Sequence, residues 1–350
     1  MILKRDDCQV LRGMAITCIF LHNYCHLLDG ATHENEFWFS NEFDSQFWES
    51  FFSPNVLLQL FSYLGHLGVP VFVFLTGYGL TMKYDDAVGK MPVNMSSFVW
   101  SHYVKFFMPM LLGMLGFMLI HYLLNGSLWE GWPATFITQM TLSNNIVPHP
   151  DRLIVPGPYW YFGMTMQLYV FYRIMVYHRS IRLLSCCAIL SVIVLSMLGT
   201  HHYALIWFKY NACGWLLPFS MGIVLGRWQP KLELTRWQWL CTSVVSGLIV
   251  LLFGGNYFLW LLIPPFAVFF FIGLCRCMPE GIYLVSCFLG NLSLYIFVIH
   301  PIVREVLLTL IPPAYQRLGT LVYMLVVVSV AYLLSLIVRR NDSLSSVNKQ

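Results

Sequence analysis

The sequence predicts an all-α fold, a polytopic membrane helical bundle with about ten transmembrane helices. Hydrophobic residues make up 58% of the 350 residues, charged residues only 10%, and the mean hydropathy is +0.67. A soluble domain of this composition would lack the polar surface that it needs. Apolar runs long enough to cross a hydrocarbon core of roughly 30 Å also recur along the whole chain.

The predicted spans follow one another without a soluble domain, a sequence repeat or a long linker. Lys4 and Arg5 precede the first run, as in a signal peptide, but Arg12 interrupts the run and no small-residue cleavage pattern follows, so we expect a retained helix. Residues 1–340 form the predicted transmembrane domain, and 341–350 form a short cytoplasmic tail that is expected to be disordered. The runs are 8–28, 56–82, 98–124, 156–178, 181–199, 209–227, 237–254, 256–275, 283–309 and 318–338.

The basic residues predict that both termini lie inside the cell, because lysine and arginine concentrate in cytoplasmic loops. Of the 20 such residues, only Arg152, Lys209, Arg304 and Arg317 fall in segments that an N-in, C-in arrangement places outside. The first outer loop, 29–55, contains acidic residues and no basic one. The net charge of +4 thus has a topological cause. We expect a multi-pass protein of the cell (inner) membrane whose partner is the lipid bilayer, with no nucleic acid.

A polar stripe interrupts the first span. Arg12 and His22 lie where a charged or titratable side chain costs several kcal/mol and usually faces a cavity that serves chemistry or transport. At about 1.5 Å per residue, His22 lies roughly 15 Å along a helix from Arg12. At about 100° per residue, His26 falls between these two side chains around the helix. We expect Arg12 near the inner face and His22 near the middle of the membrane.

Neither the ten cysteines nor the remaining histidines indicate a metal centre. The cysteines lie mostly in or beside spans and form no metal-type CxxC pair, so we expect them to act as small buried hydrophobic residues. No metal site is predicted.

Five motifs follow one another along the chain. The opening motif runs from Arg12-Gly13-Met14 to His22-Asn23-Tyr24, and the later motifs are residues 65–78, 159–169, 217–222 and 289–301. Taken in this order, the motifs resemble the acyltransferase 3 family, integral-membrane enzymes that move acyl groups from coenzyme A to glycans and related acceptors. The resemblance covers essentially the whole chain, and we expect no outer hydrolase-like domain of the kind that many relatives carry.

The resemblance implies acyl-CoA-dependent transfer to a hydroxyl group of a cell-surface polysaccharide or of its lipid-linked precursor. Acetyl-CoA or another acyl-CoA is the expected co-substrate, with no bound cofactor. His22 suits a general base, whereas the Arg12 guanidinium stays protonated and can orient the base or bind the donor. Family members often place histidine eleven positions after the arginine; here that position is Asn23, which is therefore a third catalytic candidate.

The resemblance also suggests further residues for catalysis, cavity lining and donor binding. The family's third span begins with two arginines three positions apart that handle the donor phosphates; His102 and Lys105 keep this spacing with less charge. Donor binding therefore extends to Arg12, Lys83, Arg173 and Arg179 as candidates. The other candidates for catalysis or cavity lining are His26, His66, Thr76, Trp160, Gln167, Ser293 and His300.

Two alternatives remain open from the sequence. The acyl acceptor could be a lipid-linked sugar intermediate on the inner face. The chain could also be a transporter or acyl-donor channel without enzymatic activity, although we find no inverted repeat of the kind that many transporters contain. A homo-oligomer also remains open.

Overall fold

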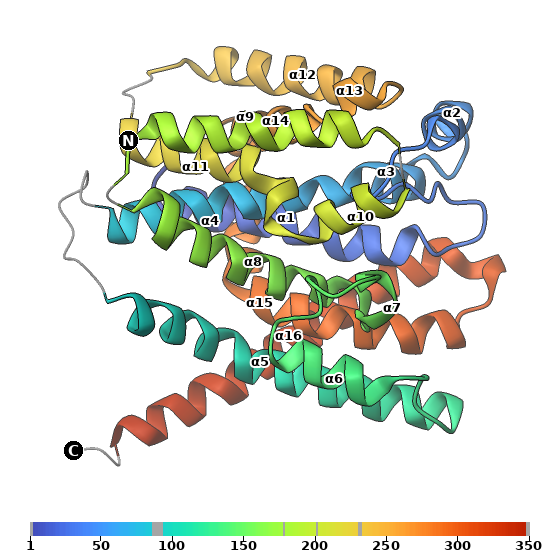
Figure 1. The fold of residues 1–350 in the computed structure, drawn as a ribbon. Coiled ribbons are helices and arrows are strands. Elements are labelled where there is room, and N and C mark those ends of the chain that lie inside the picture. Colours follow the sequence, from blue (N-terminus) through green and yellow to red (C-terminus); the bar gives the residue numbers. More distant parts are fainter. Residues whose placement is uncertain (1–2, 86–93, 178, 201, 230–232, 348–350) are drawn as a thin grey trace.

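The computed structural model describes residues 3–85, 94–177, 179–200, 202–229 and 233–347, and the regular structure in these ranges is helical. The long helices run in similar directions, and the chain alternates between the two ends of the bundle (Figure 1). α1 begins and α16 ends at the same end, on the left of Figure 1. The predicted all-α class is confirmed.

The helices follow the predicted runs in chain order. The main helices are α1 (Arg5–Cys25), α3 (Val56–Leu64), α4 (Gly68–Tyr84), α5 (Met95–Asn125), α8 (Trp160–Phe171), α9 (Ile181–Leu198), α11 (Leu216–Trp228), α12 (Arg236–Phe253), α14 (Ile263–Cys277), α15 (Glu280–Leu310) and α16 (Gln316–Val347). Shorter connecting elements include η1 (Gly65–Leu67), α2 (Asn41–Ser50), α6 (Trp132–Met140), α7 (Pro150–Leu153), η3 (Gly157–Tyr159), α10 (His202–Tyr210), η5 (Ala212–Trp215) and α13 (Tyr257–Trp260). The predicted tail, 341–350, begins inside α16, and residues 348–350 lie outside the described part of the chain.

Within the described residues, six helical segments are long and apolar enough to cross a membrane. They are Val56–Tyr84, Met95–Asn125, Ile181–Leu198, Arg236–Phe253, Glu280–Leu310 and Pro313–Val338. The other four predicted runs also form helices, but these are more polar or shorter. The run 209–227, for example, is not one helix, because η5 separates α10 from α11.

α1 lies in the interior of the bundle, where it packs most extensively against α15 and also contacts α3, α4 and η1. Glycines permit this close approach, since small residues let helix backbones touch. A Cβ atom on Gly13 would collide with the Ser286 carbonyl of α15, and one on Gly290 would collide with the Gln9 carbonyl of α1. Neighbouring helices therefore shield the polar stripe from lipid.

The peripheral helices present apolar side chains outward. In the most apolar 18-residue stretch of each segment, the share of residues buried inside the protein is 17% for α12 and 22% for α9, but 67% for Val56–Tyr84. Their exposed residues include Ile189 and Val244, which are typical of a lipid-facing surface. The bundle thus has polar groups near its centre and an apolar exterior.

Gly77 and Gly79 of α4 offer a test of this packing. A Cβ atom on Gly77 would collide with the Phe219 carbonyl of α11, whereas one on Gly79 would meet nothing within 4 Å. We expect Gly77→Ala to destabilise the protein by about 1–3 kcal/mol through overpacking. Gly79→Ala should leave stability unchanged or raise it slightly, because alanine favours helix by about 1 kcal/mol. Thermal melting in lipid nanodiscs measures both, and equal shifts would contradict the close contact of α4 with α11.

Candidate active site

A cavity of about 490 Å³ follows α1 from Arg12 to the end of the helix at Cys25 and continues to Leu27. At about 1.5 Å per residue, the part of α1 from Arg12 to Cys25 is roughly 20 Å long. The other walls come from η1, α4, α8 and α15, and from residues 35–38 of the loop that follows α1. The polar or charged side chains of the lining include Arg12, His22, Asn23, His26, Asn35, Glu36, His66, Thr76, Thr165, Ser293 and Arg304.

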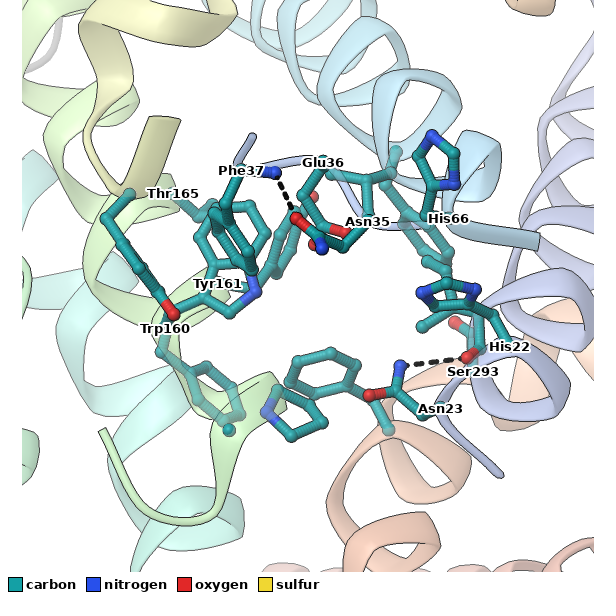
Figure 2. A pocket seen from close by; sticks show the side chains of 18 of the residues that line it. His22, Asn23, Asn35, Glu36, Phe37, His66, Trp160, Tyr161, Thr165 and Ser293 are labelled. Carbon is teal, nitrogen blue, oxygen red and sulfur yellow. Dashed lines mark hydrogen bonds between the residues drawn. The ribbon is translucent and has the colours of Figure 1, made fainter. Parts of the chain in front are cut away.

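Three histidines meet in this cavity. The ring centroid of His22 lies 4.7 Å from that of His26 and 5.5 Å from that of His66. His22 and His66 lie on one side of the cavity, and Trp160 and Tyr161 lie opposite them (Figure 2). The structure therefore brings the predicted His22, His26 and His66 together, although η1 rather than a continuous helix carries His66.

Contacts with main-chain carbonyl groups define the proton positions on two of these rings. The His22 Nδ1 atom lies 3.1 Å from the Ser62 carbonyl oxygen, and the His26 Nδ1 atom lies 2.9 Å from the His22 carbonyl oxygen. A carbonyl oxygen can only accept, so each Nδ1 atom carries a proton. In the neutral ring the Nε2 atom then holds the free lone pair that a general base requires. His22 is buried, whereas His26 is partly exposed at the end of α1.

Arginines line the cavity at both ends of this α1 segment. Arg12 donates from Nη1 to Gln9 Oε1 at 3.4 Å. Near the histidines, Arg304 of α15 donates from Nη1 to the Asn23 carbonyl oxygen at 3.3 Å. Sequence reasoning missed Arg304, yet the signal was the same as for Arg12, a charged residue inside an apolar run.

The segment 35–38 also escaped prediction, because a loop has no helical periodicity to interpret. Asn35 Oδ1 accepts from the main-chain N–H groups of Phe37 at 2.8 Å and Trp38 at 3.2 Å, which holds a turn. The Phe37 ring stacks on Tyr210 with centroids 4.1 Å apart and meets Trp160 edge-on at 5.2 Å. These contacts fix the segment as a wall of the cavity (Figure 2).

Two buried carboxyl groups accompany this wall. Glu36 lines the cavity, and burial raises its pKa to about 7. Glu34 accepts a hydrogen bond from Trp260 Nε1 at 3.2 Å, and burial raises its pKa well above the usual value. Lys209 of α10 is buried with them, and its Nζ atom lies 4.4 Å from the Trp260 ring centroid. Glu36 is therefore a carboxyl group that titrates near neutral pH at the cavity surface.

Thr76, Trp160 and Ser293 join the cavity lining, but Gln167 and His300 do not. Gln167 donates from Nε2 to Asn211 Oδ1 at 2.8 Å and accepts from the Ala212 N–H group at 2.9 Å, so it connects α8 to the start of η5. His300 is buried, with Nδ1 3.2 Å from the Ile296 carbonyl oxygen of its own helix. Both positions favour a structural role.

The predicted donor-binding residues do not gather around the cavity, with the exception of Arg12. His102 is buried behind Tyr169, a lining residue, with ring centroids 4.3 Å apart. The Arg173 guanidinium lies 4.1 Å from the Tyr177 ring centroid. The remaining candidates, Lys83, Lys105 and Arg179, are exposed.

Comparison with known families identifies the chain. The model of the acyltransferase 3 family, described as an acyltransferase domain, matches residues 6–340. The chain belongs to the acyltransferase 3 family. Membership implies acyltransferase activity at a membrane, and the family resemblance of the sequence motifs is confirmed. No match was found among curated proteins or among solved structures.

The structural role of Gln167 in this acyltransferase can be tested by removing its amide. Gln167→Leu would leave Asn211 and the Ala212 N–H group without these partners, and an unsatisfied buried polar group costs about 1–3 kcal/mol. We expect a lower thermal midpoint in nanodiscs. Asn291→Leu is the control, because this exposed amide donates, within the described residues, only to Cys287 of its own helix. A Gln167→Leu protein of normal stability would contradict the assignment.

Proposed function

We propose that this acyltransferase 3 protein moves an acetyl or other short acyl group from cytosolic acyl-CoA to a hydroxyl group of a cell-surface polysaccharide or its lipid-linked precursor. The observation that carries the proposal is His22, whose Nδ1 atom is engaged by the Ser62 carbonyl and whose ring lines the cavity. This arrangement leaves the lone pair of the Nε2 atom for proton abstraction.

The proposed topology has about ten crossings of the cell (inner) membrane, with both termini inside. It is supported by the distribution of lysine and arginine and by the alternation of the helices between the two ends of the bundle (Figure 1). α1 then starts at the inner end. Arg12 lies on the donor side, whereas His22, three residues before the end of α1 at Cys25, lies nearer to the outer side.

In the proposed reaction, His22 Nε2 removes the proton of the acceptor hydroxyl group while the oxygen of that hydroxyl group attacks the thioester carbonyl carbon. The tetrahedral intermediate collapses, the carbon–sulfur bond breaks, and the coenzyme A thiolate takes the proton from His22. Arg12 stays protonated and binds phosphate groups of the donor. We propose direct transfer, without an acyl-enzyme intermediate.

A glycan acceptor is supported by the wall near the segment 35–38. Phe37, Trp160 and Tyr210 contribute aromatic rings to the lining, and Glu36 contributes a carboxyl group. Aromatic faces suit the C–H faces of sugars, and an ionised carboxylate accepts hydrogen bonds from their hydroxyl groups. We propose that Glu36 binds a hydroxyl group of the acceptor.

His22→Ala tests the proposed base. Purified protein in nanodiscs is incubated with labelled acetyl-CoA and glycan from the cell envelope of its host, and labelled glycan is counted. Because general base catalysis contributes about 10²–10⁴-fold, we expect a rate loss of at least about 100-fold. His149→Asn, at an exposed histidine outside the cavity, should transfer at the normal rate.

A folded His22→Ala protein with full transfer would show that His22 is not the base. Formation of labelled glycan by the wild-type protein supports the enzyme, whereas binding of acetyl-CoA without any chemical conversion would favour a transporter or channel.

Glu36→Gln tests acceptor binding. The raised pKa of Glu36, about 7, means that the carboxylate forms as pH rises through neutrality, so the wild-type KM for glycan should fall between about pH 6 and about pH 8. Lys209 and Glu34 are the titratable groups next to Glu36. Glu36→Gln should lose this trend and raise the KM about tenfold or more at the higher pH, since hydrogen bonds to charged groups contribute about 1.5–3 kcal/mol.

Glu42→Gln, at an exposed position in the first turn of α2, is the matched control and should keep the wild-type pH profile. An unchanged KM profile in Glu36→Gln would remove Glu36 from the acceptor site.

A further inference from the structure

Arg304 projects from α15 into the wall of the cavity beside α1. Its Nη1 atom lies 3.3 Å from the Asn23 carbonyl oxygen and 3.5 Å from Asn23 Oδ1. Asn23 directly follows His22 in the sequence, so the guanidinium group contacts the residue next to the proposed base. Asn23 is itself oriented by a hydrogen bond from Nδ2 to the Ile19 carbonyl oxygen at 2.9 Å.

The charge of Arg304 has no carboxylate partner among the described residues. The adjacent Glu305 pairs instead with His121, with Oε1 2.9 Å from Nδ1. Other arginines of the bundle do pair with carboxylates, as in Arg227–Asp85, where Nη2 and Oδ2 are 2.7 Å apart, and Arg276–Asp7, where they are 3.1 Å apart. An unpaired cation inside a bundle is costly, and such residues commonly mark a ligand site.

Most donors of Arg304 remain for a ligand. A guanidinium group has five N–H donors, and within the described part of the chain Arg304 uses only Nη1, in two long contacts with Asn23. The group lines the same cavity as His22 and His26. A negatively charged group in this cavity would supply the partner that the described residues do not.

We propose that Arg304 is a catalytic residue that stabilises the negatively charged oxygen formed from the acyl carbonyl group, with Asn23 as its positioning residue. When the acceptor oxygen bonds to the carbonyl carbon, the π-electron pair of the C=O bond moves to the oxygen. Arg304 keeps its protons and donates hydrogen bonds to this oxygen. When the C=O bond re-forms, the carbon–sulfur bond breaks and the coenzyme A thiolate leaves. Charged donors that are already oriented toward such an oxygen are effective in a site that excludes water.

This role rests on the proposed acyl transfer, and it differs from binding a fixed anion of the acceptor, such as a carboxylate or phosphate group. The two can be separated by hydrolysis of acetyl-CoA without glycan. Water then replaces the acceptor, but the same negatively charged oxygen still forms. A residue that binds only the acceptor would not affect hydrolysis.

The experiment compares Arg304→Met, Arg304→Lys and Arg304→Ala with Arg317→Met in nanodiscs. Arg317 is the matched control, because it is exposed on α16 and donates from Nε to Asn55 Oδ1 at 2.7 Å. We expect Arg304→Met to lower kcat for both glycan acetylation and hydrolysis by about 10²–10³-fold, with each KM changed less than about threefold. Arg304→Lys should retain part of the rate, and added guanidinium should restore part of the activity of Arg304→Ala. Arg317→Met should match the wild type.

A higher glycan KM with normal kcat and normal hydrolysis would overturn the proposal and assign Arg304 to acceptor binding. Normal kinetics in any folded Arg304 variant that lacks the guanidinium group would also overturn it. If Arg304→Met does not fold, Arg304→Lys and the guanidinium rescue decide the question. A wild-type protein that neither hydrolyses acetyl-CoA nor acetylates glycan would instead overturn the proposed function, and this role with it.

Discussion

Close packing around α1 is the constraint on which the site depends. A helix that carries Arg12 and His22 cannot face lipid without a large cost, so it must be enclosed by other helices. Gly13 and Gly290 allow α1 and α15 to touch, and Gly65 lies against the backbone of α1 near His22. The same close approach brings α3 carbonyl groups to the histidine ring. The same close packing of helices thus shields α1 from lipid and orients the proposed base.

The charge distribution in the cavity follows from this enclosure. Arg12 and Arg304 face it near opposite ends of the α1 segment, and the described residues place no carboxylate within ion-pair distance of either. The histidines between them engage carbonyl oxygens through Nδ1. Glu36 lines the cavity near the histidines, but the two arginines remain fixed cations that suit ligands bringing negative charge with them. The phosphate groups of acyl-CoA are negatively charged, and the carbonyl oxygen of the acyl group becomes negatively charged during transfer.

Helical periodicity was sufficient to predict Arg12, His22 and His26 on one wall, because all three follow the regular geometry of α1 or its C-cap. It could not predict residues 35–38, whose position depends on contacts with Tyr210, far away in the sequence. Arg304 could have been found as Arg12 was, because it is a charged residue inside an apolar run. The same reasoning wrongly favours Gln167, since a polar residue in a span can make a structural contact as readily as it can serve chemistry.

The departure from the family's paired arginines has a consequence for donor binding. Lys105 is exposed and His102 lies behind Tyr169, so within the described residues Arg12 is the cavity-lining cation on the predicted donor side. If Arg12 holds the phosphates, the thioester must reach His22, roughly 15 Å further along α1. The wall beside this path combines apolar side chains such as Ile19 with polar ones such as Thr76 and Thr165. An extended pantetheine arm suits such a wall, because its methylene groups need no polar partners whereas its two amide groups do. The distance from Arg12 to His22 would then match the length of the donor from its phosphate groups, at Arg12, to its thioester carbon, at His22.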